Sequence, residues 1–155
     1  MKFVTVVFLV TLMLVGAAPA HEYTSVGIKI EHPWARATPQ GATTAVAYVK
    51  ITNTGKTPLR LVGGSTSVAA RVEMHEMSMD GGVMRMRPVP GVDIAPGATV
   101  EFKAGGLHLM LIGLNRQLMQ EDMVPVTLQF ADGAKLLIDL YVEGMGAGGG
   151  DHGHS

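Results

Sequence analysis

The sequence contains no cysteine, and this absence narrows its possible chemistry. A disulfide framework, a thiolate zinc site, an iron–sulfur cluster, a blue-copper centre and a cysteine nucleophile all require thiols. An excess of charge of one sign is lacking too, because 12 Lys and Arg side chains stand against 13 Asp and Glu among 155 residues. Since a nucleic-acid binder needs a basic patch, that class of protein is not favoured.

Residues 1–20 have the features of a cleavable secretory signal peptide. Lys2 supplies a positive charge, residues 3–15 form a mainly apolar run, and Ala-Pro-Ala at positions 18–20 makes a small-residue cleavage site. The apolar run is shorter than the roughly 20 residues that a bilayer crossing needs. We therefore predict a periplasmic protein whose mature chain begins at His21 and has no membrane span.

The mature chain alternates apolar and polar residues in short runs, which is typical of β-strands. Gly, Pro, Asn and Asp break these runs at the spacing of a sandwich or barrel. The predicted strands are Val26–Ile30, Trp34–Ala37, Thr44–Asn53, Leu59–Thr66, Ala70–Met77, Val83–Pro88, Thr99–Lys103, Leu107–Ile112, Val124–Phe130 and Lys135–Val142. We predict one all-β domain over residues 21–144 and a disordered Gly/His tail over residues 145–155.

A methionine cluster draws attention to the middle of the chain. Five of the eleven methionines lie within thirteen residues, around His75; they are Met74, Met77, Met79, Met84 and Met86. If Asp80 and Gly81 form a two-residue type I′ turn, opposed residue numbers sum to 161 and His75 faces Met86. The side chains then predicted to share one face of the hairpin are those of His75, Met77, Met84 and Met86. A longer loop would shift this register.

A second part of the pattern lies on an apolar strand further along the chain. Period two places His108 and Met110 on one face and Leu109 on the other, which we interpret as the core face. In the first hairpin strand, Val72 and Met74 are likewise assigned to the core face. We therefore predict that the His and Met side chains lie on the non-core face, where another protein can reach them.

Imidazoles and thioethers form a soft, uncharged ligand set. It suits Cu(I), whereas Mg, Ca and Mn prefer oxygen and zinc sites use thiolate, imidazole or carboxylate. A thioether cannot form a disulfide and carries no charge, so it can hold Cu(I) in an oxidising compartment and still release it. We predict carriage rather than catalysis, because the sequence shows neither a nucleophile elbow nor an acid/base carboxylate pair.

The spacing of these residues resembles that of a known family. Met86 follows His75 after ten intervening residues, His108 follows Met86 after twenty-one, and Met110 follows His108 after one. This spacing matches the H-x10-M-x21-H-x-M signature of the periplasmic copper chaperones called PCu(A)C. The flanking segments 31–37, 73–75, 82–86 and 105–110 are similar as well, and the resemblance covers residues 28–142. One departure is Glu76, which stands where the family has an optional methionine.

The resemblance implies a cupredoxin-like Greek-key β-sandwich or barrel that binds one Cu(I) through His75, Met86, His108 and Met110. It also implies delivery of copper to respiratory oxidase assembly, notably to the dinuclear copper centre of cytochrome c oxidase subunit II. A Sco-type protein of thioredoxin fold often acts alongside. We expect a monomer. Met77 and Met84, which fit core packing and a reserve-ligand role equally well, are accessory candidates.

Histidines outside the signature leave alternatives open. His21, as the mature N-terminal residue, offers an amine and an imidazole to Cu(II), as in copper monooxygenases and some copper-resistance proteins. The alternative function is therefore a copper-dependent oxidase or a copper-resistance or storage protein. His152 and His154 belong either to a solvated tail or to an extra Cu(II) or Zn site. His32 is interpreted as structural and Trp34 as core. A metal-free adhesion or interaction sandwich would leave the His/Met cluster without a role.

Overall fold

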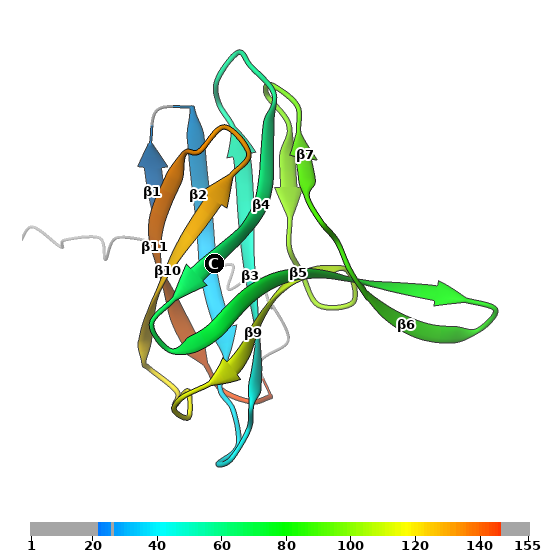
Figure 1. Cartoon of the computed structure of the whole chain (residues 1–155), viewed down its shortest axis with the longest axis vertical. Helices are drawn as coiled ribbons and strands as arrows, with labels where there is room; N and C mark the ends of the chain where they lie inside the picture. Colours follow the sequence, from blue (N-terminus) through cyan, green and yellow to red (C-terminus); the bar gives the residue numbers. More distant parts are fainter. Residues whose placement is uncertain (1–21, 26, 147–155) are drawn as a thin grey trace, which may run out of the picture.

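The computed structural model describes residues 22–25 and 27–146, which form one continuous β-sheet (Figure 1). Its strands are β1 (Glu22–Ser25), β2 (Ile28–Arg36), β3 (Thr44–Asn53), β4 (Leu59–Thr66), β5 (Ala69–Asp80), β6 (Val83–Pro88), β7 (Val92–Ile94), β8 (Thr99–Glu101), β9 (Leu107–Leu114), β10 (Met123–Phe130) and β11 (Lys135–Glu143). Within the described part there is no helix, and so none that could cross a bilayer. The all-β prediction is confirmed. The predicted signal peptide, His21, His152 and His154 lie outside the described residues.

Seven strands close the sheet into a barrel. Around the barrel the order is β2, β11, β10, β4, β5, β9 and β3, and β3 pairs with β2 to complete the ring. The β11–β2 pair is parallel, and the other six pairs are antiparallel. Because closure leaves no free edge on the ring itself, the remaining strands β1, β6, β7 and β8 are additions that each pair with one barrel strand.

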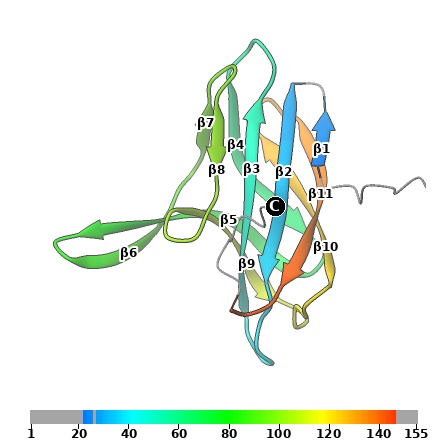
Figure 2. The same cartoon turned by 180° about the vertical axis from the view of Figure 1, so that it is seen from behind.

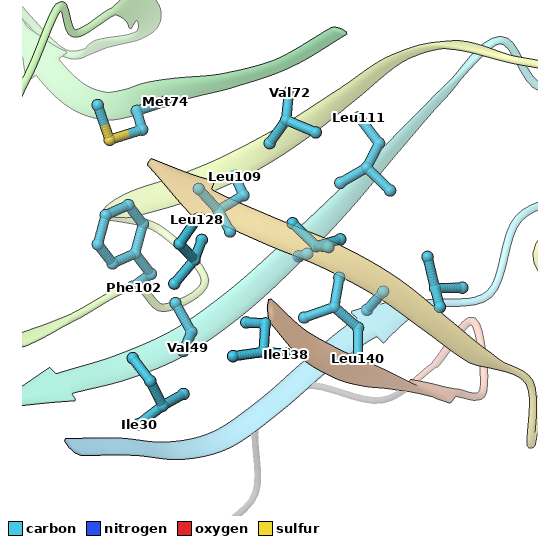
Figure 3. Packing of buried hydrophobic residues seen from close by; sticks show 14 of the residues in the cluster. Ile30, Val49, Val72, Met74, Phe102, Leu109, Leu111, Leu128, Ile138 and Leu140 are labelled. Carbon is cyan, nitrogen blue, oxygen red and sulfur yellow. The ribbon is translucent and has the colours of Figure 1, made fainter. Parts of the chain in front are cut away.

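The barrel interior is filled by the alternate residues of its strands. In β10, Val124, Val126 and Leu128 are buried while the residues between them are half-buried or exposed. Figure 3 shows Leu128 with Met74 and other inward-facing side chains. Each large aliphatic side chain removed from water in this way contributes roughly 1.5–3 kcal/mol to folding. Trp34 is buried too, but outside the core to which it was assigned. It is opposite Tyr48 on the outer face of the barrel, with ring centroids 4.6 Å apart, whereas its neighbour Ala35 points into the core.

Apart from shifts of a few residues at strand ends, the strand predictions differ from the structure in three places. The predicted strands 26–30 and 34–37 are one strand, β2, whose register against β3 shifts between Glu31 and Trp34. There His32 has a φ of 50°, a left-handed conformation that accompanies the local disruption. A bulge breaks the alternation without ending the strand, so the prediction of two strands was wrong. The short strands β1 and β7 were not predicted, because three or four residues carry too little periodicity.

The hairpin of β5 and β6 extends beyond the barrel wall (Figures 1 and 2). β5 pairs with β9 as far as Glu76, and the Met77 N–H donates to the Gly106 carbonyl at 3.1 Å. From His75 onward β5 also pairs with β6, whose six residues are all exposed. We call the segment from Met77 to Met86 the ribbon, because beyond the barrel its two strands pair only with each other.

Candidate metal centre

Two histidines meet at the base of the ribbon, where β5 and β9 run side by side. His75 is directly opposite His108, with ring centroids 6.0 Å apart. Directly opposed residues of an antiparallel pair point to the same face of the sheet. Their neighbours Met74 and Leu109 lie in the core, as predicted. Both imidazoles therefore lie on the non-core face.

His108 is held in one orientation by its backbone neighbour. Although it lies on the outer face, it is only 4% exposed, and its Nδ1 is 3.0 Å from the Gly106 carbonyl oxygen. A carbonyl can only accept, so the ring proton belongs on Nδ1. The lone pair of Nε2 then points at Met86 Sδ, 3.2 Å away. A hydrogen bond from one ring nitrogen that leaves the other one available is the usual arrangement of a metal-binding histidine.

The separation of Nε2 and Sδ suits a shared metal ion. A closed-shell ion bonds imidazole nitrogen and sulfur at about 2.0–2.3 Å, so one ion can bridge donor atoms up to roughly 4 Å apart. Without a proton between them, two lone pairs that face each other at 3.2 Å have no mutual attraction. A soft cation between His108 and Met86 would supply it.

His75 is oriented by Glu73, a carboxylate that was not among the predicted site residues. Its Nε2 lies 3.0 Å from Glu73 Oε2, and Arg71 Nε donates to Glu73 Oε1 at 2.9 Å. The hydrogen bond with His75, followed by that with Arg71, lowers the pKa of the Glu73 carboxyl. An ionised carboxylate that accepts from Nε2 leaves Nδ1 of His75 as the nitrogen that can bind a metal. The signal in the sequence was the position of Glu73, two residues before His75 and hence on the same face.

Met110 completes the group of predicted ligands. It is half-buried, follows His108 by two residues and therefore lies on the same face of β9. Across the ladder it is opposite Glu73, which makes it a diagonal neighbour of His75. Diagonal positions are about 7–8 Å apart, within reach of a methionine side chain. The ladder thus brings His75, His108 and Met110 together on one face, and Met86 reaches them from the ribbon.

The register of the ribbon differs from the predicted one by two residues. The two-residue turn is Gly81-Gly82, with φ values of 57° and 81°, and opposed residue numbers sum to 163. A type I′ turn needs positive φ at both central residues, which two glycines adopt more easily than Asp-Gly. The opposed pairs are His75 with Pro88, Met77 with Met86 and Met79 with Met84. Since the shift is even, the predicted face is retained, and Met79 on that face is opposite Met84 instead of Gly82.

The other candidates occupy different environments. Met74 is buried in the core, as predicted, whereas Met77 is half-buried and Met84 exposed on the ribbon. His32 lies on β2, with its Nε2 3.5 Å from Glu143 Oε1, in keeping with a structural role. No three His, Asp or Glu side chains of residues 22–25 and 27–146 are grouped to hold a metal ion. A centre built on His75 and His108 would therefore need ligands of another kind, and the methionine sulfurs beside them are candidates.

Comparison with known proteins identifies the family. The family model described as "Putative lipoprotein LpqE-like" matches residues 28–142. The curated relative "Putative lipoprotein Lxx21020" of Leifsonia xyli subsp. xyli is 34% identical over 109 residues, which cover 70% of this chain. The same residues cover 64% of that relative, so the chain spans less than two thirds of its length.

Solved structures extend the comparison to the fold. The copper-bound PCuAC domain from PmoF2 is 29% identical, with a TM-score of 0.69 over 80% of this chain and 98% of that domain. The solution structure of CuI-DR1885 from Deinococcus radiodurans is 30% identical, with a TM-score of 0.54 over 72% of this chain and 74% of that one. The barrel is the cupredoxin-like fold of PCuAC domains. The chain belongs to the LpqE-like family, of the PCuAC type that the spacing of its His and Met residues resembles.

Proposed function

We propose that this chain is a periplasmic copper carrier that binds one Cu(I) through His75, Met86, His108 and Met110. The observation that carries the proposal is the 3.2 Å approach of His108 Nε2 to Met86 Sδ, because it brings an imidazole and a thioether from separate strands to one point. Both are neutral donors that favour Cu(I) over oxygen-loving cations. The copper-bound PCuAC domain and the Cu(I) form of DR1885 support the same choice of metal.

The position of the site favours transfer over catalysis. Met86 is 51% exposed and belongs to the ribbon, so an incoming ligand can approach its sulfur from solvent. A thioether donor is neutral and exchanges more readily than a thiolate, which is bound as an anion. An acceptor protein can therefore displace Met86 first and remove the ion from His108 afterwards. We propose that the chain carries copper and is not an enzyme.

The acceptor that we propose follows from the family resemblance. It is the dinuclear copper centre of cytochrome c oxidase subunit II during oxidase assembly, with a Sco-type protein as an additional partner. Export through a cleavable signal peptide would place the monomeric carrier beside such acceptors. The relative named as a lipoprotein supports a location in the cell envelope.

Binding is tested by anaerobic titration of the full chain with Cu(I) against a chromophoric chelator. We expect one tight equivalent, which His108→Ala removes. The matched control is Met119→Leu, which changes an exposed methionine on the loop between β9 and β10. Undiminished Cu(I) affinity in a folded His108→Ala protein would contradict the proposed site.

Delivery is tested separately by deleting the gene and assaying oxidase activity at limiting copper. We expect low activity that is restored by the wild-type gene and by excess copper, but not by the His108→Ala gene. Full oxidase activity in the deletion strain at limiting copper would overturn the delivery role and leave the binding site intact.

A further inference from the structure

The ribbon carries more sulfur than the four-ligand site requires. Met77 is opposite Met86, and Met79 is opposite Met84, so four thioethers lie on one face in two adjacent cross-strand pairs. Opposed Cβ atoms in such pairs are about 4.5–5.5 Å apart. A methionine side chain has three rotatable bonds and a polarizable sulfur, so these sulfurs can converge on a single ion.

Core packing does not explain these methionines. Met79, Met84 and Met86 are 66%, 56% and 51% exposed, and the ribbon projects away from the barrel (Figure 2). Methionine fills gaps in hydrophobic cores, but this segment has no core to fill. β-Branched or aromatic residues would stabilise an exposed hairpin more than methionine does, because they have a higher strand propensity. Core packing therefore does not account for these three exposed methionines, which share one face of the hairpin with half-buried Met77.

The opposite face of the β5–β6 hairpin, in the ribbon and at its base, is built differently. Arg87 Nη2 donates to Glu76 Oε2 at 3.0 Å, and Arg85 Nε lies 3.4 Å from Asp80 Oδ2. These ion pairs join the two strands and keep charge on one side. The other side is left with thioethers, a soft and neutral surface suited to a soft monovalent cation.

We propose that Met77, Met79, Met84 and Met86 form a second binding site, made only of thioethers, for a soft monovalent cation such as Cu(I) or Ag(I). The site needs no histidine, and it ends at Met86, whose sulfur also faces His108. Its role as an entry point rests on the proposed function of the His/Met centre. An ion caught at the ribbon exchanges thioethers one at a time and reaches His108 through Met86, with no change of oxidation state.

The two sites are expected to differ in strength. The ribbon offers neutral thioethers that are open to water, whereas the inner centre adds two imidazoles, of which His108 is nearly buried. Because Met86 belongs to both sites, full occupancy of the inner centre leaves three thioethers for the second ion. We expect the second equivalent to bind more weakly and to exchange faster than the first.

The test uses Ag(I), which is closed-shell and resists redox chemistry, with the full chain labelled at its methionine methyl groups. The first equivalent should shift the NMR signals of Met86 and Met110. A second equivalent should shift those of Met77, Met79 and Met84. The signals of Met119 and Met123, exposed methionines near the start of β10, serve as internal controls and should stay in place.

Three double variants separate this proposal from the proposed function. Met79→Leu with Met84→Leu keeps the apolar surface but removes two sulfurs, so it should abolish the second equivalent and leave the first within about twofold. Met119→Leu with Met123→Leu should retain both equivalents. His75→Ala with His108→Ala should lose the tight equivalent and keep the weak one, so failure of the inner centre is distinguishable from failure of the ribbon.

Either of two results would overturn the ribbon site. One is an absence of shifts at Met79 and Met84 at several equivalents of Ag(I). The other is a second equivalent that persists in the Met79→Leu, Met84→Leu protein. In both cases the exposed face would be an apolar docking surface, which leucine preserves.

Discussion

The barrel and the ribbon use the same alternation of residues for opposite purposes. In the barrel, the inward face of β10 is apolar and inaccessible to solvent, and its alternation produces a core. In the ribbon, neither face is covered, and alternation sorts thioethers from charged residues. Met74 and Met84 illustrate the difference, because the first is buried and the second exposed although both belong to the same hairpin. Burial, not residue type, therefore decides whether a methionine packs in the core or is free to bind a metal ion.

The largest effect that we predict from this difference between barrel and ribbon is a loss of stability in the barrel. Leu128→Ala empties part of a fully buried position and should lower the free energy of unfolding by about 2–5 kcal/mol. Leu137→Ala on the neighbouring strand removes an exposed side chain and should change it by no more than about 0.5 kcal/mol. Chemical denaturation measures both. Equal losses would mean that the interior of the barrel is not its source of stability.

Lowering the pH should weaken Cu(I) binding at the His/Met centre, whereas the thioethers of the ribbon do not titrate. An imidazole must be deprotonated to bind a metal, and histidine is the side chain that ordinarily titrates between pH 8 and pH 5. Cu(I) affinity should therefore fall over this range, by about tenfold or more. Competition titrations at several pH values measure the effect. A flat profile would exclude His75 and His108 as ligands.

Removing one inner sulfur should separate binding from folding. Met110→Leu is nearly isosteric, so it should cost less than about 1.5 kcal/mol of stability. It should weaken Cu(I) binding by at least about tenfold, because a carbon replaces a ligand. Affinity is measured by chelator competition and stability by thermal unfolding. Met123→Leu is the matched control, and an unchanged affinity in Met110→Leu would remove this residue from the site.

The carboxylate beside His75 should have a smaller effect. Glu73→Ala removes the partner that fixes the ring, and losses of this kind are about 10-fold to 100-fold in metal affinity. We expect a loss at the lower end of this range, because the site retains the imidazole of His108 with its own backbone hydrogen bond. Glu73→Gln keeps an acceptor and should lie between wild type and Glu73→Ala. Equal affinities for all three proteins would show that Glu73 does not position His75.

The smallest expected effect concerns a loop of the barrel. The hydrogen bond from the Met119 N–H, followed by that from Arg116, lowers the pKa of Asp122 from its usual 3.8. The stability it contributes is therefore present above pH 3.8 and is lost as pH falls through the lower folded-state value. Asp122→Asn should cost about 0.5–1 kcal/mol at pH 7. The difference from wild type should vanish in strong acid; a difference independent of pH would assign the effect to packing.

Much of this architecture was accessible from the sequence, because period and spacing are local properties. The alternation around Leu109 correctly assigned core and outer faces, and the strands that carry the candidate ligands were located. What could not be predicted depends on contacts between strands. The bulge at His32 breaks the pattern of β2 without ending it, and the choice between two glycine-containing turns at Gly81 set the register. The approach of Met86 to His108 joins β6 and β9, two strands that do not pair with each other, so the alternation within either strand does not encode it.

The parity of the turn has a consequence for the gene. A hairpin whose register changes by two residues keeps every methionine of β6 on the same face, as the difference between the predicted and observed registers illustrates. Insertion or loss of a single codon between Gly82 and Met84 would instead exchange Met84 and Met86 with Arg85 and Arg87. Length variation in this loop should therefore be tolerated in steps of two codons and rejected in steps of one. Keeping the methionines on the proposed metal-binding face thus restricts changes in the length of this loop to even numbers of codons.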